Sequence, residues 1–284
     1  MNAQERDREV IFHIRRYDPD TGGEPTWRHY PVAVKPGMTI LDGLHYVKEH
    51  HDSSLAWRFS CRMGVCGSCA MLISGMARLA CNTQILDVSD SAVTLAPLPN
   101  YDIIKDLVPD LTPMFEHHAS LRPWLIRPDT DEIFSPTGEY RQSPEELEAY
   151  IQFTNCIKCG ACLAACPTVA TDPSYPGPMP LAQGYRFCID SRDGGCEDRR
   201  DVLDSSHGLY SCHYAGECSR VCPKGVDPAR AIQLMKRHLV FSYLGFAGRR
   251  EPSELISGPE PGAQRLPEVP DPPAYTVEGA GEES

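Results

Sequence analysis

The 284-residue sequence predicts an α+β fold, in which a small mixed sheet wrapped on one helix is followed by a mainly helical region. Runs rich in β-branched and aromatic residues, which favour strands, are concentrated in the first third of the chain. After Pro97 and Pro99 the apolar residues recur at helical spacing instead. The chain is also long enough for two domains. We expect these domains at 1–100 and 101–248, with a disordered Pro- and Glu-rich tail at 249–284.

The elements of the first domain follow from turn and capping residues. Asp18-Pro19-Asp20 and a pair of glycines separate the first two strands. Thr39 can cap a helix that carries Ile40, Leu44 and Val47 on one face. Strands are expected at 8–17, 26–34, 69–74, 78–82 and 92–96.

The second domain shows three helical signals. The apolar residues from 103 to 111 have helical spacing. Ser143-Pro144 combines a capping box with proline at the first helical position, and that helix should run into the next cysteine motif. Asp227-Pro228 repeats the signal of a cap residue followed by proline and starts a helix that extends to about Leu244.

Composition excludes several classes of protein. A formal net charge of −12 argues against nucleic-acid binding, which needs a basic surface. The longest near-apolar run, around Leu239–Gly248, is shorter than a membrane span. The N-terminus has no apolar segment of the kind found in secretory signals, so we do not interpret the 13 cysteines as a disulfide framework.

The first cysteine motif has the plant-type ferredoxin spacing C-x4-C-x2-C, with a fourth cysteine downstream. Gly64 and Gly67 allow the backbone to curl so that its N–H groups can hydrogen-bond cluster sulfurs. Structural zinc is the alternative, but zinc hooks are usually paired and a dozen or more residues apart. We therefore assign a [2Fe–2S] cluster to Cys61, Cys66, Cys69 and Cys81.

The second cysteine group is an internal repeat, with similar runs at 156–167 and 212–223. The first run has the bacterial ferredoxin pattern C-x2-C-x2-C-x3-C-P. The second run has the same period, but Ala215 occupies its second ligand position.

The ligands in the repeat are assigned from the pattern of two-cluster ferredoxins. In these proteins the first three cysteines of a run bind one cluster, and the fourth binds the cluster of the other run. One cluster then has four thiolates, which suit [4Fe–4S]: Cys156, Cys159, Cys162 and Cys222. The other has three thiolates and a vacant corner facing Ala215. We expect a [3Fe–4S] cluster there, on Cys166, Cys212 and Cys218.

Two cysteines remain outside these motifs. Cys188 falls at helical spacing with Leu181 and Ile189, which predicts a small buried hydrophobic residue. Cys196 lies in a glycine-rich loop. We expect an inert surface cysteine there and assign it no role.

The order of these motifs resembles that of the iron–sulfur subunit of succinate dehydrogenase and fumarate reductase, respiratory complex II. The resemblance extends over about residues 8–245 and includes CRMGVCGSC, CIKCGACLAACP, YRFCIDSRD and CSRVCPKGVDP. It implies a β-grasp [2Fe–2S] ferredoxin domain to about residue 100. An α-helical ferredoxin domain with two clusters would follow.

The resemblance also implies a function, namely electron transfer in a membrane-bound oxidoreductase, with no dicarboxylate chemistry on this chain alone. Electrons would pass between the FAD of a flavoprotein subunit and a quinone at the interface with membrane-anchor subunits. The clusters would act in the order [2Fe–2S], [4Fe–4S], [3Fe–4S]. The chain would lie peripherally on the cytoplasmic face of the inner (plasma) membrane, held by the anchor subunits.

The quinone site implied by the resemblance comprises Pro167, His213, Gln233 and Lys236. Gln233 and Lys236 are three apart and so share a helix face, for which a solvated surface is the alternative interpretation. Thr168 to Thr171 replace a tryptophan that the succinate dehydrogenase branch usually carries after the Cys-Pro. The segment CSRVCPKGVDPARAIQ leans towards the fumarate reductase branch, which tends to pair with menaquinone. The physiological direction and the kind of quinone stay open.

The sequence disfavours two other functions. The thiol-linked fumarate reductases usually carry a further domain with Cys-Cys-Gly motifs, and this sequence contains no such motif. A structural scaffold that holds zinc or clusters without redox chemistry would have no need of three different kinds of site.

Overall fold

The computed structural model describes residues 8–246 and 252–257. They form two compact units. The first contains the described residues of Met1–Pro128 and Gln142–Ser253, and the second those of Asp129–Arg141 and Glu254–Ser284. The α+β fold class predicted from the sequence is confirmed, with a mixed sheet in the first part of the chain and helices after it.

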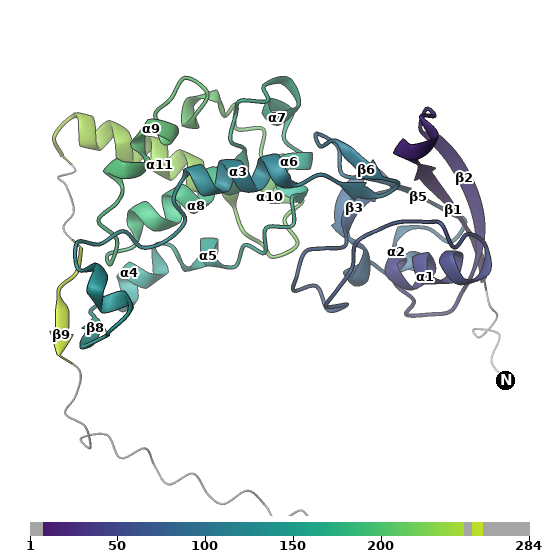
Figure 1. Cartoon of the computed structure of the whole chain (residues 1–284), viewed down its shortest axis with the longest axis horizontal. Coiled ribbons are helices and arrows are strands. Elements are labelled where there is room, and N and C mark those ends of the chain that lie inside the picture. Colours follow the sequence, from purple (N-terminus) through teal and green to yellow (C-terminus); the bar gives the residue numbers. More distant parts are fainter. Residues whose placement is uncertain (1–7, 247–251, 258–284) are drawn as a thin grey trace, which may run out of the picture. The chain divides into compact units, whose positions relative to one another are not determined.

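A five-stranded mixed sheet forms the N-terminal part of the first unit (Figure 1). Its strand order is β2-β1-β5-β3-β4, in which β1 and β5 are parallel and the other pairs are antiparallel. The strands are β1 (Arg8–Arg16), β2 (Thr26–Val34), β3 (Ala70–Ile73), β4 (Met76–Leu79) and β5 (Ala92–Ala96). Alternate residues of β1, namely Val10, Phe12 and Ile14, are fully buried, as expected for a sheet with one face on the core.

Helix α1 (Ile40–His50) packs on this sheet and begins at the predicted residue. Thr39 and Asp42 form a capping box, in which each side chain accepts a hydrogen bond from the backbone N–H of the other. Gly43 lies against the ring of Phe12, and a Cβ there would approach that ring to 2.5 Å. The absence of a side chain at this position therefore sets how closely the helix approaches the sheet.

The strand predicted at 78–82 is wrong in its bounds, because the observed strand β4 covers Met76–Leu79. Strand β4 ends at Leu79, and Ala80–Asn82 form a 3-10 turn, η2. The short helix α2 (Ile85–Val88) follows. The turn carries Cys81 and thereby brings it back towards the first cysteine motif.

The predicted helix over 103–111 is also wrong. The chain instead forms a hairpin of β6 (Ile103–Lys105) and β7 (Val108–Pro109). The buried carboxylate of Asp106 in its turn accepts hydrogen bonds from Arg16 Nε at 2.9 Å and from the N–H of Ala56 at 2.9 Å. These long-range bonds, together with a proline that lacks an N–H group, outweigh the local apolar spacing.

The remainder of the first unit is helical. Helices α8 and α11 pack against each other, and the shorter helices surround them (Figure 1). The helices are α3 (Thr112–Ser120), α4 (Pro144–Glu148), α5 (Ile151–Thr154), α6 (Ala161–Ala164), α7 (Pro167–Thr171), α8 (Pro178–Ile189), α9 (Arg200–Leu203), α10 (Glu217–Arg220) and α11 (Pro228–Tyr243). 3-10 turns occur at η1 (Pro19–Thr21), η4 (Glu197–Arg199) and η5 (Leu209–Ser211).

Two of the predicted helix starts are confirmed. Ser143 forms a capping box at the start of α4, and the Asp227 side chain accepts a hydrogen bond from the N–H of Arg230 at the start of α11. The helix from Ser143 is nevertheless interrupted before the cysteine motif. Tyr150 separates α4 from α5, because its ring is buried and its hydroxyl bonds to Gln142 Oε1 at 2.9 Å.

The second unit contains an antiparallel pair of β8 (Gly138–Tyr140) and β9 (Leu255–Ser257), with the 3-10 turn η3 (Thr130–Ile133) before it. Strand β9 falls in the segment that the sequence predicts as a disordered tail. Its backbone groups find partners in β8. The other residues of that tail, apart from 252–254, lie outside the described residues.

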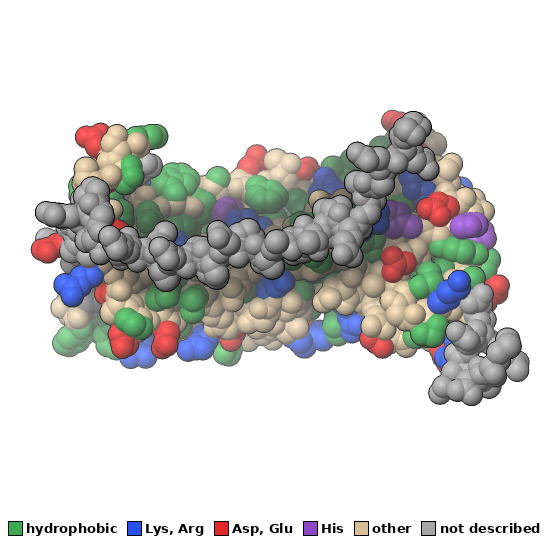
Figure 2. Space-filling view, turned by 90° about the horizontal axis from the view of Figure 1, so that it is seen from below, with side chains coloured by type: hydrophobic (Ala, Val, Ile, Leu, Met, Phe, Trp, Pro, Cys, Tyr) green, Lys and Arg blue, Asp and Glu red, His purple; other side chains and the backbone are tan. Residues whose placement is uncertain are grey.

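Charged side chains of both signs are interspersed on the face drawn in Figure 2. None of the helices in the described residues combines the length and the apolar composition that a membrane crossing requires.

Candidate metal centres

The first cysteine motif forms a loop between α1 and β3 in which backbone N–H groups point at sulfur atoms. The N–H groups of Val65 and Cys66 donate to Cys61 Sγ at 3.3 and 3.2 Å. The N–H of Gly64 donates to Cys81 Sγ at 3.2 Å. Such amides stabilise negative charge on sulfur, whether in a free thiolate or in a thiolate bound to metal.

The environments of these thiols differ. Backbone N–H groups, that of Met63 first, lower the pKa of the Cys61 thiol to about 6. Burial raises the pKa of Cys69 instead. Cys66 is exposed, whereas Cys69 and Cys81 are buried. The loop therefore has one side at the surface and the other in the core.

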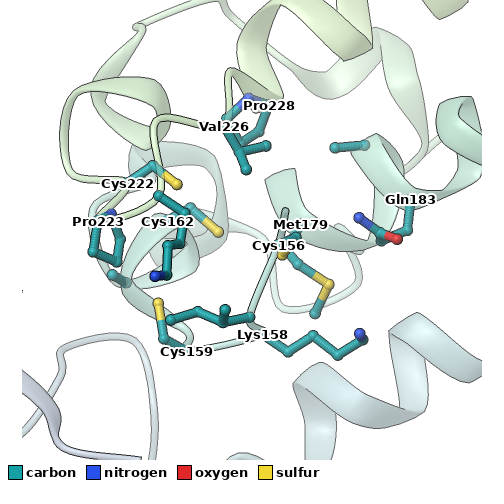
Figure 3. Close-up of a pocket in the computed structure, with 14 residues that line it drawn as sticks. Cys156, Lys158, Cys159, Cys162, Met179, Gln183, Cys222, Pro223, Val226 and Pro228 are labelled. Atoms are coloured by element: carbon teal, nitrogen blue, oxygen red, sulfur yellow. The ribbon is translucent and has the colours of Figure 1, made fainter. Parts of the chain in front are cut away.

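Four cysteines of the helical region line one cavity of about 420 Å³, a volume that includes its opening to solvent (Figure 3). Most other residues on its wall are apolar, among them Met179, Val226 and Pro228. The four cysteines come from both runs of the repeat and are those that the sequence groups together: Cys156, Cys159, Cys162 and Cys222.

Three further cysteines line a second cavity of about 320 Å³, together with Ala215. They are Cys166 from the first run and Cys212 and Cys218 from the second. The cavity thus has three thiols and a methyl group where a fourth thiol would stand.

The two runs of the repeat have the same backbone conformation. Lys158 and Tyr214 occupy equivalent positions with φ of 54° and 59°, and Gly160 and Gly216 follow with φ of 83° and 77°. A four-residue helix comes next in both runs, α6 in the first and α10 in the second. Ala215 therefore stands where the first run has a cysteine, and the difference between the two sites is one of side chain only.

The chemistry of the donors fits iron–sulfur clusters. Burial raises the pKa of Cys159 and of Cys218 to about 11, so these thiols would keep their protons without a metal. A bound metal removes the proton of a coordinating thiol outright, and soft thiolate sets suit iron–sulfur clusters. Among the residues that the structure describes, no three His, Cys, Asp or Glu side chains form a group that could hold one metal ion.

The first cysteine loop packs directly on the second. Gly67 has φ of +77°, and a Cβ there would stand 2.8 Å from the Cβ of Cys159 and 3.1 Å from the carbonyl oxygen of Ile157. Tyr101 adds a hydrogen bond from its hydroxyl to the carbonyl oxygen of Gly160 at 3.1 Å. The two motifs are therefore in van der Waals contact.

The four residues predicted at a quinone site fall into two pairs. Pro167 and His213 line the three-thiol cavity. Gln233 and Lys236 lie on α11 and are not among its lining residues. Lys236 Nζ donates to the carbonyl oxygen of Cys212 at 3.0 Å, and Gln233 Nε2 is buried without a hydrogen-bond partner among the described residues.

The fold and these thiol sets define an iron–sulfur electron-transfer protein. Comparison with known proteins agrees. A 2Fe-2S iron-sulfur cluster binding domain model matches residues 11–116, and a 4Fe-4S dicluster domain model matches residues 152–226.

Curated relatives identify the family. The fumarate reductase iron-sulfur subunit of Mycobacterium tuberculosis is 45% identical over 80% of this chain and 91% of its own length. The succinate dehydrogenase iron-sulfur subunit of Paracoccus denitrificans is 42% identical over 81% of this chain and 87% of its own length. A chain of the Mycobacterium smegmatis Sdh1 complex matches in structure with a TM-score of 0.70 and 27% identity, covering 84% of this chain and 98% of the other.

The chain belongs to the iron–sulfur subunit family of fumarate reductase and succinate dehydrogenase. It is an electron-transfer subunit of an oxidoreductase complex of the complex II type, and its clusters include those of the [2Fe–2S] and [4Fe–4S] domains. The family predicted from the cysteine motifs is thereby confirmed.

One cluster of side chains was missed from the sequence. Cys196, expected to be an inert surface residue, is only partly exposed, and its thiol lies close enough to that of Cys188 for each to shift the pKa of the other. Its sulfur also lies 4.0 Å from Nε2 of His238, on α11. No local pattern links a loop cysteine to a histidine so far along the chain, whereas the predicted burial of Cys188 on a helix is confirmed.

Proposed function

We propose that this chain relays single electrons between the FAD of a flavoprotein subunit and a quinone held with membrane-anchor subunits. The observation that carries the proposal is the pair of cavities built from one repeat, of which one has four thiols and the other has three thiols and Ala215. A site with one thiolate missing suits a cluster with one iron missing. Three different cluster types in one chain are useful for a relay and have no evident purpose in a scaffold.

The ligand sets proposed from the sequence agree with this arrangement. The [2Fe–2S] cluster would be held by Cys61, Cys66, Cys69 and Cys81, the [4Fe–4S] cluster by the four thiols of the larger cavity, and the [3Fe–4S] cluster by the three thiols beside Ala215. When bound, the clusters supply one-electron redox chemistry.

The protein side chains and amides position this relay. The N–H groups of the first loop favour negative charge on its sulfurs, which is one means of tuning a cluster's potential. The contact of Gly67 with Cys159 keeps the first two sites close. Cys162 and Cys218 belong to one buried apolar cluster with Met114 and Met179, which excludes water between the second and third sites.

Exposed apolar residues at the two ends of the relay support docking to two partners. Beside the first site Phe59, Met63 and Val65 are exposed, and Met63 is the most exposed of the three at 73%. We assign this surface to the flavoprotein subunit, since large exposed apolar patches mark interfaces.

Apolar residues are also exposed at Tyr214, next to the three-thiol site, and at Tyr243 and Leu244 at the end of α11. We assign these residues to contact with the membrane-anchor subunits. We further propose that the chain lies peripherally on the cytoplasmic face of the inner membrane, held by those subunits.

The quinone would lie beside the three-thiol cavity. Pro167 and His213 would contact it, because both line that cavity. Lys236 is bonded to the backbone of Cys212, and we assign it a positioning role for the loop that carries His213. The buried, unpartnered Nε2 of Gln233 is an available hydrogen-bond donor on the same helix.

Purification of the intact complex from membranes tests the proposal. We expect a flavoprotein and one or more membrane polypeptides to co-purify, with iron and acid-labile sulfide in similar amounts. EPR should show a [3Fe–4S] signal in the oxidised complex and a [2Fe–2S] signal after reduction. Zinc without labile sulfide, or a chain isolated without partners from gently solubilised membranes, would contradict it.

A further inference from the structure

A second group of reactive side chains lies apart from the cluster sites. Cys188 is buried in the last turn of α8, and Cys196 is partly exposed in the loop just before η4. The two side chains pack in the same apolar cluster, and each lies close enough to shift the pKa of the other. His238 of α11 completes the group, with Nε2 at 4.0 Å from Cys196 Sγ.

The loop that carries Cys196 is held firmly in place. The carboxylate of Asp193 accepts hydrogen bonds from the N–H of Gly195 at 2.7 Å and from Arg199 Nη1 at 2.7 Å, and both charged side chains are fully buried. The N–H of Gly194 donates to the carbonyl oxygen of Ile126 at 2.9 Å.

Gly195 adds a steric constraint to this loop. A Cβ at Gly195 would stand 2.5 Å from a side-chain atom of Ile126, so only glycine fits. The position of the Cys196 thiol relative to Cys188 is thus built into the fold.

The two thiols have opposite electrostatic environments. The interaction with the Cys188 thiol, followed by that with His238, lowers the pKa of Cys196 to about 6. Burial raises the pKa of Cys188. Arg199 adds positive charge near both thiols, and the nearby carboxylate of Asp193 is neutralised by its ion pair with Arg199. One cysteine is therefore suited to act as a nucleophile and the other to stay protonated beside it.

We propose that Cys196 and Cys188 form a peroxide-reactive dithiol site, in which Cys196 is the attacking cysteine and Cys188 the resolving cysteine. The sulfur of Cys196 attacks one peroxide oxygen and the O–O bond breaks. This gives a sulfenic acid and, after proton transfer, one water from hydrogen peroxide.

The resolving step completes the balance of atoms and electrons. Cys188 sulfur then displaces the sulfenic oxygen, which leaves with the Cys188 proton as a second water while the S–S bond forms. Two thiols lose two electrons in total, and the peroxide is reduced to water. His238 stabilises the Cys196 thiolate and acts as proton carrier. A small-molecule thiol or a protein dithiol would restore the reduced pair by exchange.

The chain offers a direct test by mass spectrometry of the intact complex. Trypsin cleaves after Arg186, Arg192 and Arg199, so the two cysteines fall into separate peptides, 187–192 and 193–199. The complex is treated with sub-stoichiometric hydrogen peroxide, and free thiols are alkylated before digestion. We expect these two peptides to be joined by a disulfide, while the visible absorbance of the clusters is retained.

Variants separate the roles of the residues. In Cys188→Ala, dimedone should label Cys196 as a trapped sulfenic acid. In Cys196→Ser, neither the disulfide nor the label should form. His238→Gln should slow alkylation of Cys196 at pH 7 roughly tenfold, because its thiolate fraction falls. His207→Gln, which removes an exposed histidine bonded to Asp172, serves as a control and should leave the rate unchanged.

The proposal would be overturned by either of two outcomes. One is that Cys196 alkylates no faster than an ordinary thiol in the intact complex. The other is that peroxide oxidises other cysteines while peptides 187–192 and 193–199 stay separate. Cluster content, measured by EPR in every variant, shows whether a variant has failed to assemble, and in that case the alkylation rate of the unaltered complex decides.

Discussion

At the scale of single residues, Ala215 distinguishes two cysteine runs that have the same backbone conformation. Its neighbours Tyr214 and Gly216 repeat the positive φ values found in the first cysteine run. A cysteine at this position would therefore find its Sγ directed into the three-thiol cavity without any change in the main chain. The sequence predicted this vacancy because the spacing of ligands along a chain is a local property.

Ala215→Cys should convert the three-thiol site into a four-thiol site. We expect most of the [3Fe–4S] EPR signal of the oxidised complex to disappear, because a fourth thiolate retains the fourth iron. Ala170→Cys, which adds a thiol at an exposed position on α7, should leave the signal unchanged. An undiminished [3Fe–4S] signal in Ala215→Cys would contradict the proposed ligand sets.

His118 gives the helical region a pH-dependent stability. Burial, and then the positive charge of Lys158, lower the pKa of this histidine to about 4, and its Nε2 is buried without a hydrogen-bond partner among the described residues. The unfolded chain binds the proton with a pKa near 6.5. As the pH falls below 6.5, this histidine binds a proton in the unfolded chain but stays neutral in the folded protein. The free energy of unfolding therefore decreases.

His118→Gln tests this effect, because glutamine does not titrate. Between pH 7 and pH 5 the wild-type protein should lose about 1–2 kcal/mol more stability than the variant. Thermal unfolding of the complex at both pH values measures the difference. Equal losses in the two proteins would show that the histidine titrates normally in the folded state.

At the scale of elements, loops of unusual backbone conformation decide how the cysteine motifs meet. The N–H groups of the first loop face its sulfurs, and Gly67 lies directly on Cys159 in the second motif. A glycine pattern in the sequence indicated a curled loop. It could not indicate which distant residue the loop would contact.

Gly67→Ala should disrupt this contact. The left-handed backbone alone costs an alanine about 1 kcal/mol, and the overlap with the Cys159 backbone adds to that cost, for a total of about 3 kcal/mol. Gly75→Ala is the matched control. It has φ of +82° with no atom within 4 Å of the added Cβ, so it should cost only about 1 kcal/mol.

Thermal unfolding and the amplitude of the [2Fe–2S] EPR signal would measure both Gly67→Ala and Gly75→Ala. We expect a reduced [2Fe–2S] content only in Gly67→Ala. Equal effects of the two substitutions would show that backbone strain, and not the contact with Cys159, determines the result.

At the scale of the whole first unit, the sheet region and the helical region share one core. Ala161, Ala164 and Val221 from the two cysteine runs are buried in the same cluster as the strands of the sheet. Asn100, with φ of 65°, donates from its side-chain amide to the carbonyl oxygens of Leu163 at 2.9 Å and Ala164 at 3.1 Å. These bonds give carbonyl groups at the C-terminal end of α6 a side-chain donor, in addition to the N–H of Cys166, which donates to the Leu163 carbonyl oxygen at 3.1 Å.

Asn100→Gly tests this connection, since glycine keeps the positive φ and removes only the side chain. We expect a loss of about 1–2 kcal/mol from the missing hydrogen bonds. Limited proteolysis of the complex should become faster near residue 100, with cluster content unchanged. Unaltered proteolysis and unfolding would show that the shared apolar core alone connects the two regions.

The sequence by itself determined the features that depend on local spacing. These are the fold class, the caps at Thr39, Ser143 and Asp227, the cysteine motifs and hence the family of the chain. Ligand spacing and helix caps depend on only a few consecutive residues, so they can be predicted without knowledge of the fold.

Only the tertiary structure decided the features that depend on distant partners. The helix expected over 103–111 became a hairpin because Arg16 binds the carboxylate of Asp106. Cys196 gained a thiol and an imidazole as neighbours because α8 and α11 pack together. Long-range contacts of this kind have no periodic signature in the chain, since they arise only when separate elements converge in space.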